Sequence, residues 1–120
     1  MRRNLGAVAF AALMVVAAPA WAQDAPAGNA ETGKKLFLAD GCYECHGRVG
    51  QGGAFNGPAP ILAQTQLPFD AFKQQLREPS ADMPAYADTV LPDGGVADIY
   101  AFLRALPGPK PVKDIAILNH

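Results

Sequence analysis

The chain is poor in the residues that usually cross-link a small protein or hold a structural metal. Its 120 residues include two cysteines and two histidines. Cys42 and Cys45 are three positions apart, so the sequence offers no disulfide between distant segments. A structural zinc site would need a second pair of ligands, and the only histidine away from these cysteines is the last residue, His120. The sequence therefore disfavours both a disulfide-stabilised fold and a structural zinc site.

Regular patterns other than helical ones are also missing. No segment predicts a convincing strand, and no internal repeat is present. The glycine-rich segment 47–53 does not have the spacing of a phosphate-binding loop that leads into a helix. The sequence therefore predicts an all-α fold.

The first 22 residues have the features of a secretory leader. Arg2 and Arg3 give a positive start, and an apolar run too short to span a bilayer follows from Leu5 to Ala18. Ala20-Trp21-Ala22 supplies a small-x-small cleavage signal. We expect residues 1–22 to be a cleaved signal peptide, which predicts export to the periplasm and no membrane span after cleavage.

Cleavage would change the charge of the protein. The whole chain has a formal net charge of −1, and the leader removes two arginines but no acidic residue, which leaves −3. A net acidic protein is a poor match for nucleic acid. We expect no nucleic-acid partner.

Cys42-Tyr43-Glu44-Cys45-His46 is the most informative segment of the chain. Two thiols three positions apart, followed directly by an imidazole, form the attachment signature of c-type haem. Each thiol can add to one vinyl group of the porphyrin, and His46 is then placed to reach the iron. A redox-active disulfide at this spacing would want a βαβ context, which the sequence does not predict. The expected cofactor is one covalent haem c.

Apolar periodicity predicts three main helices. The first runs from Ala30 or Glu31 to Asp40, where Gly41 ends it. The second covers Phe69 to Arg77, and the last begins near Asp93 or Gly94 and stops before Pro107. The segments between them, including Ser80 to Leu91, are expected to be loops.

A sixth iron ligand is expected from the loop before the last helix. Met83 is the only methionine after the leader, and it lies 37 residues beyond His46. A thioether is a soft ligand that raises the reduction potential of a haem. Filling a gap in the core, an open site, and His120 as the ligand are the alternatives. We predict His46 and Met83 as the two metal ligands.

The imidazole of His46 also needs a hydrogen-bond partner. A metal-bound histidine normally donates its second ring N–H to a carbonyl, which fixes the ring. Pro58 is the first candidate acceptor and Pro60 the second. Pro58 therefore joins Cys42, Cys45, His46 and Met83 as a predicted cofactor-binding residue.

Together these residues resemble the class I c-type cytochromes, and especially the single-haem members that serve dehydrogenases. The resemblance spans Ala30 to Leu106 and also includes Gly33-x-x-x-Phe37, Gly57-Pro58, Met83-Pro84 and an aromatic last helix. It implies three to five helices around one covalent haem, with Phe37 and Tyr100 packed where the first and last helices cross near Gly33. The resulting organisation is a signal peptide (1–22), a flexible lead-in (23–30), a cytochrome c domain (31–107) and a C-terminal tail (108–120).

The family often has a tryptophan near a haem propionate, and this chain departs from that pattern. Its only tryptophan is Trp21, in the leader. Arg48, Gln64 and Tyr86 are the remaining candidates for propionate partners.

The predicted function is one-electron transfer rather than catalysis, because no acid–base pair or nucleophile accompanies the motif. The partners would be redox proteins: a dehydrogenase that donates electrons, and a cytochrome or oxidase that carries them towards a respiratory chain. The alternative is a haem-based gas sensor or a peroxidase-like enzyme, either of which would need Met83 to leave the iron.

Overall fold

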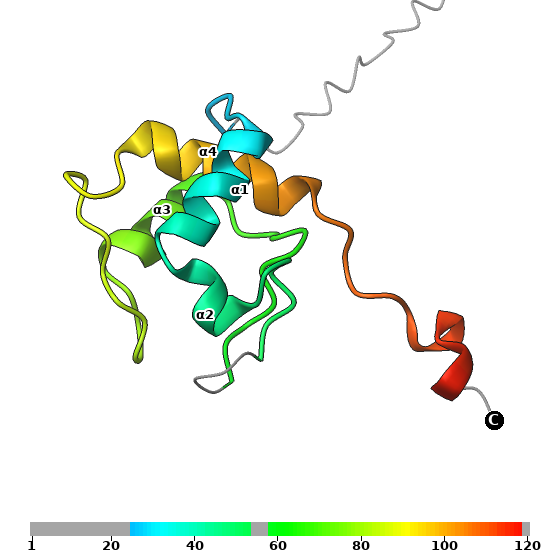
Figure 1. Cartoon of the computed structure of the whole chain (residues 1–120). Coiled ribbons are helices and arrows are strands. Elements are labelled where there is room, and N and C mark those ends of the chain that lie inside the picture. The colour runs from blue at the N-terminus through cyan, green and yellow to red at the C-terminus, as the bar shows by residue number, and fades with distance from the viewer. Residues whose placement is uncertain (1–24, 54–57, 119–120) are drawn as a thin grey trace, which may run out of the picture.

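The computed structural model describes residues 25–53 and 58–118, and all regular structure in these ranges is helical. The predicted all-α fold is confirmed, while the expected signal peptide lies outside the described residues. Figure 1 shows how the helices pack together in one domain. Their bounds are α1 Ala30–Ala39, α2 Cys42–His46, α3 Phe69–Arg77 and α4 Asp93–Ala105, with 3₁₀ turns η1 Val112–Asp114 and η2 Ala116–Leu118.

α1 begins and ends where the local sequence favours it. The side chain of Asn29 caps the helix by accepting a 2.9 Å hydrogen bond from the backbone N–H of Thr32. At the other end Gly41 adopts a left-handed conformation with φ of 76°, which a glycine adopts without strain. The chain turns there directly into α2, so the cysteine motif lies on a short helix that apolar periodicity does not predict.

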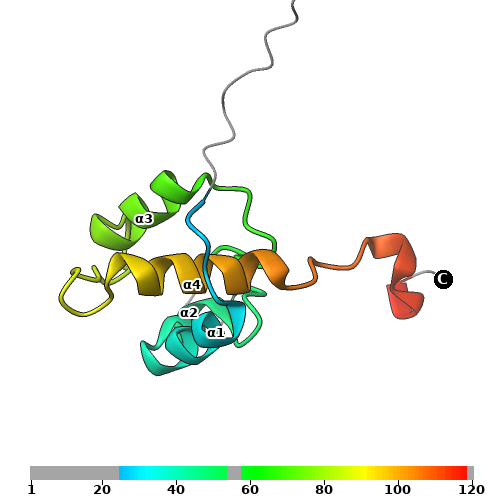
Figure 2. The same ribbon diagram turned by 90° about the horizontal axis from the view of Figure 1, so that it is seen from above.

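α4 is the central helix of the domain. Figure 2 shows it running between α3 on one side and α1 with α2 on the other. Its buried residues accordingly face in several directions around the helix: Val96, Ala97, Ile99, Tyr100, Phe102 and Leu103. A helix buried on both sides holds its neighbours in place, and α4 thereby fixes where α1 delivers the motif.

The crossing of α1 and α4 lies at Gly33, as predicted. A Cβ at Gly33 would collide with the backbone carbonyl of Asp98, so only glycine allows this approach. The aromatic partner at the crossing differs from the prediction. Phe37 packs on Phe102, with ring centroids 5.5 Å apart, and not on Tyr100.

Tyr100 instead packs on the opposite neighbour, α3. Its ring lies 5.4 Å from that of Phe69 and 5.2 Å from that of Phe72, and its hydroxyl donates a 2.7 Å hydrogen bond to the carbonyl of Leu67. Tyr100 and Phe102 are two positions apart, so they point to different sides of the helix. Each aromatic therefore serves a different interface of α4.

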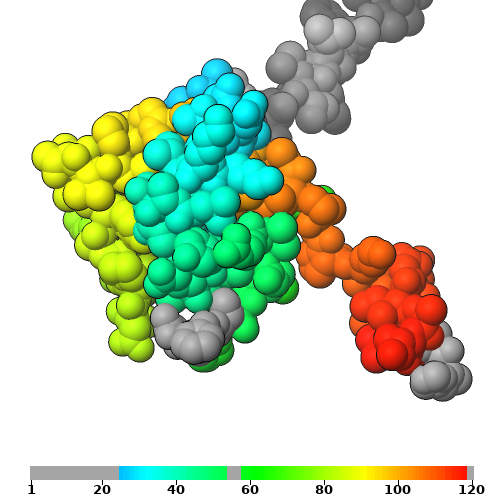
Figure 3. Space-filling view, in the orientation of Figure 1, coloured from blue at the N-terminus to red at the C-terminus, as the bar shows by residue number. Residues whose placement is uncertain are grey.

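The C-terminal tail leaves the domain after α4. In Figures 1 and 3 the residues beyond Pro107 extend away from the body of the molecule. Among the helices of the described chain, η1 and η2 pack only on each other. None of the helices in the described ranges is long and apolar enough to cross a membrane.

Candidate functional site

Helix α2 brings the three residues of the predicted attachment motif together. Cys42 and Cys45 are at i and i+3 of this helix, so their side chains lie on neighbouring positions of one face. They form no disulfide with each other, and both are half-buried. His46 ends the helix and is 8% exposed. The thiols are thus accessible from one side, while the imidazole is held within the protein.

The imidazole of His46 is oriented by a backbone carbonyl. Its Nδ1 lies 3.0 Å from the carbonyl oxygen of Pro60. A carbonyl can only accept, so Nδ1 carries the proton and Nε2 keeps the lone pair that binds a metal. The acceptor is Pro60 and not Pro58, which corrects the order of the two candidates given by the sequence.

Hydrogen bonds across the loop explain why Pro60 is the acceptor. The N–H of Gly52 donates to the carbonyl of His46, and the N–H of Gly53 donates to the carbonyl of Ala59. These bonds fold the loop back so that the residue after Ala59 meets the imidazole. Gly52 has φ of 74°, and a Cβ there would approach the Ala59 carbonyl oxygen to 2.8 Å. The glycine-rich segment therefore positions Pro60.

The thiol of Cys42 lies in an apolar environment next to Tyr86. Burial raises the pKa of this thiol to about 11, an effect that a hydrogen bond with Tyr86 partly offsets. Before any bond to a cofactor forms, Cys42 is therefore protonated at neutral pH. The same burial raises the pKa of Tyr86 to about 12, so its hydroxyl stays neutral.

Met83 lies on the loop between α3 and α4. Its side chain is half-buried against the core, and the Nε2 of Gln75 on α3 lies 3.7 Å from its sulfur. No hydrogen bond in the described chain joins Met83 to His46. The structure thus gives two groups of predicted site residues. One is the cysteine motif with Pro60, and the other is Met83 on the loop of residues 78–92, called the Met83 loop below.

Tyr86 links these two groups, three residues after Met83. Its backbone N–H donates a 2.8 Å hydrogen bond to the carbonyl of Leu76 on α3. Its hydroxyl donates a 2.9 Å bond to the carbonyl of Asp40, two residues before Cys42. Among the residues suggested as propionate partners, Tyr86 thus already has a hydrogen-bond acceptor in the protein.

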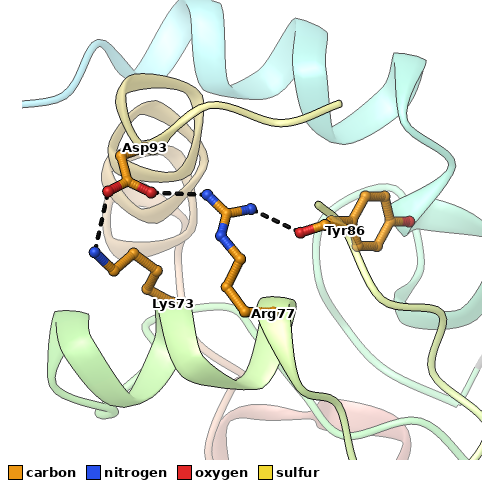
Figure 4. Close-up of polar contacts among 4 residues, drawn as sticks. All are labelled: Lys73, Arg77, Tyr86 and Asp93. Carbon is orange, nitrogen blue, oxygen red and sulfur yellow. Dashed lines mark hydrogen bonds and ion pairs between the residues drawn. The ribbon is translucent and has the colours of Figure 1, made fainter. Parts of the chain in front are cut away.

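Arg77 also holds the backbone of Tyr86, by donating a hydrogen bond to its carbonyl. The sequence alone did not predict a role for Arg77. Figure 4 shows its guanidinium between the carbonyl of Tyr86 and the carboxylate of Asp93. Both distances are 2.7 Å. Asp93 also forms an ion pair with Lys73, whose Nζ lies 3.1 Å from the carboxylate. Charged residues at helix ends are common in any sequence, and only the fold shows that Arg77 and Asp93 meet.

The residues present fit a covalently attached haem. Cys42 and Cys45 supply two thiols on one face, and His46 offers Nε2 in the tautomer that binds iron. Tyr43, Leu62 and Met83 pack against the core while keeping part of their surface outside it. A large apolar ring would cover such surface favourably.

Comparison with known protein families identifies the family to which this chain is similar. The family model described as cytochrome c oxidase, cbb3-type, subunit III matches residues 28–103. This range contains α1, α2, α3 and all but the last turn of α4, and it includes every predicted site residue. Comparison with curated proteins and with solved structures found no match.

Proposed function

Because this chain belongs to the class I c-type cytochromes and carries covalent haem c, we propose that it is a periplasmic one-electron carrier with His46 and Met83 as iron ligands. Haem c supplies the chemistry, since its iron alternates between Fe(II) and Fe(III). The protein's task is to hold, ligate and enclose that iron. The observation that carries this proposal is the His46–Pro60 hydrogen bond at the end of the cysteine motif.

His46 would be the proximal ligand through Nε2. The Pro60 carbonyl holds the Nδ1 proton, which fixes the plane of the imidazole and makes Nε2 a better donor to iron. His46 is also buried, which restricts its reorientation. A ligand that does not reorient suits a carrier, because little rearrangement then accompanies the electron.

Met83 would be the distal ligand. It is the only methionine of the described residues, and its half-buried position on the α3–α4 loop leaves its thioether able to face a cofactor. A thioether favours Fe(II) over Fe(III) and so raises the reduction potential. A protein that holds both axial positions also leaves no iron coordination site for a substrate, which supports a carrier over a peroxidase-like enzyme.

Periplasmic export is supported by the sequence of residues 1–22 alone. A positive start, a short apolar run and a small-residue cleavage signal occur there in the expected order. Attachment of the haem would then follow export, when the two thiols are available for the vinyl groups.

The redox partners are proposed at the level of class. A dehydrogenase would reduce the haem, and a cytochrome or oxidase of a respiratory chain would oxidise it. The description of the matched family names an oxidase subunit, so permanent assembly into an oxidoreductase complex is the second candidate. Isolation of the native protein from the periplasm distinguishes them: a free carrier is recovered alone, and a subunit is recovered in a stable complex.

Redox titration tests the carrier function directly. We expect the haem-loaded protein to titrate reversibly as a single one-electron centre and to show no turnover of hydrogen peroxide. Steady peroxide consumption by the native protein would instead support the enzyme alternative.

A further inference from the structure

The Met83 loop has few attachments of its own. Besides the packing of Met83 on the core, the side chain of Gln75 lies 3.3 Å from the Ser80 hydroxyl and 3.7 Å from the Met83 sulfur. Pro84 and Ala85 are exposed, and Met83 is only half-buried. Three residues of extended chain reach about 10 Å, so the nearest fixed point of the backbone limits where Met83 can lie. That point is Tyr86, whose backbone is bonded on both sides: its N–H to Leu76 and its carbonyl to Arg77.

Arg77 joins three elements at this point. It is the last residue of α3, its Nη1 donates to the carbonyl of Tyr86 on the loop, and its Nη2 donates to Asp93, the first residue of α4. The side chain is 20% exposed, so water competes with these bonds only in part. A guanidinium can make both bonds with fixed geometry, whereas an ammonium is a single flexible point charge.

We propose that Arg77 is a positioning residue for the sixth iron ligand: it clamps Tyr86 between α3 and α4 and so holds the Met83 loop against the cofactor. This inference rests on the proposed ligation by Met83. It assigns a role in ligation to a residue that does not itself contact the iron. Loss of the clamp should let the loop open and expose the iron to external ligands.

Lys73 provides a matched control. It lies on the same helix and pairs with the same carboxylate, but its ammonium bonds only Asp93 and makes no hydrogen bond with Tyr86. Lys73→Gln therefore removes one positive charge and one contact to Asp93, as Arg77→Gln does, while leaving the bond to Tyr86 in place.

Two readouts on the haem-loaded protein test the proposal. The first is the rate of carbon monoxide binding to the reduced protein, and the second is hydrogen exchange at the amide of Tyr86. Arg77→Gln should raise both by about tenfold or more, as expected for a lost hydrogen bond to a charged group. Lys73→Gln should change them by less than about twofold, as expected for an exposed ion pair.

The outcomes separate this inference from the proposed ligation. If the unmodified protein resists carbon monoxide and Arg77→Gln resists it equally, with unchanged exchange at Tyr86, the clamp is wrong and the ligation stands. If the unmodified protein binds carbon monoxide freely, the proposed ligation by Met83 is wrong. Hydrogen exchange at the amide of Tyr86 then tests the clamp by itself: faster exchange in Arg77→Gln supports it, and unchanged exchange refutes it. Arg77→Lys, which retains the charge, serves if Arg77→Gln does not fold. It should also speed exchange, because a flexible ammonium does not hold both bonds in the fixed geometry of a guanidinium.

Discussion

Gly33 on α1 lies directly against the backbone carbonyl of Asp98 on α4. A Cβ at Gly33 would overlap that carbonyl, so the two helices approach more closely here than side chains normally allow. Asp98 also accepts a 2.6 Å hydrogen bond from the backbone N–H of Asn29, just before α1 begins. One residue of α4 thus fixes both the depth of the crossing and the start of the helix that leads to the haem motif.

A methyl group at this crossing should therefore be costly. We expect Gly33→Ala to lower the free energy of unfolding by about 1–3 kcal/mol or more. The atoms that a Cβ would meet belong to the backbone, so they cannot move away by changing a rotamer. Gly94→Ala is the matched control, since no heavy atom lies within 4 Å of a Cβ there. It should be neutral or stabilise by up to about 1 kcal/mol. Denaturant titration of both variants is the test, and equal effects would contradict the close crossing.

The two aromatics of α4 should couple to different helices. Phe37→Ala and Phe102→Ala should each cost about 3–5 kcal/mol, because both rings are buried. In a double-mutant cycle this pair of tilted rings should show a coupling of about 0.5–1.5 kcal/mol, as aromatic pairs do. Phe37 and Tyr100 should be additive to within about 0.5 kcal/mol. A measurable coupling between Phe37 and Tyr100 would contradict the observed packing and support the contact between these two residues that the sequence predicts.

Asp93 should make part of the stability pH-dependent. Hydrogen bonds from Arg77 and Lys73 hold the pKa of its carboxyl below the ordinary value. Its contribution is thus fully present above the unfolded pKa of about 4 and is lost as the pH falls through the lower folded pKa. Below about pH 4, stability should fall more steeply in the native protein than in Asp93→Asn. Parallel curves from acid titrations at fixed denaturant would show that the pairs contribute nothing.

The mature protein should begin at Gln23 and contain one covalently bound haem. The cleavage signal at Ala20-Trp21-Ala22 and the attachment motif lead to this expectation. Intact-mass measurement after periplasmic expression tests both parts. Replacement of Cys42 and Cys45 by alanine should give a chain that loses its haem on denaturation, whereas a native chain without haem mass would refute the attachment.

Local sequence rules were sufficient for α1, α3, α4 and the cysteine motif, but not for the short helix α2. The apolar spacing of Phe69, Phe72 and Leu76, with Pro68 before it, gave the bounds of α3 as observed. Asn29 and Gly41 marked the two ends of α1 in the same way. These signals act within one or two turns of the chain, so one sequence is enough to read them.

Contacts between distant segments were where the sequence was insufficient. α4 is buried on two sides, so its periodicity could not tell which of Tyr100 and Phe102 faces α1. The choice of Pro60 over Pro58 depends on hydrogen bonds between the two arms of the loop. The meeting of Arg77 with Asp93 depends on how α3 packs beside α4. In each case a tertiary contact decided between residues that are locally equivalent.

Carbon monoxide titration of the reduced native protein, compared with Met83→Ala, tests the central claim most directly. If Met83 holds the sixth position, the native protein binds carbon monoxide poorly, while the variant binds it readily and has a lower reduction potential, because the thioether that blocks the site and favours Fe(II) has gone. Rapid binding by the native protein, with no difference in potential between the two, would contradict the account and support a sensor or an enzyme.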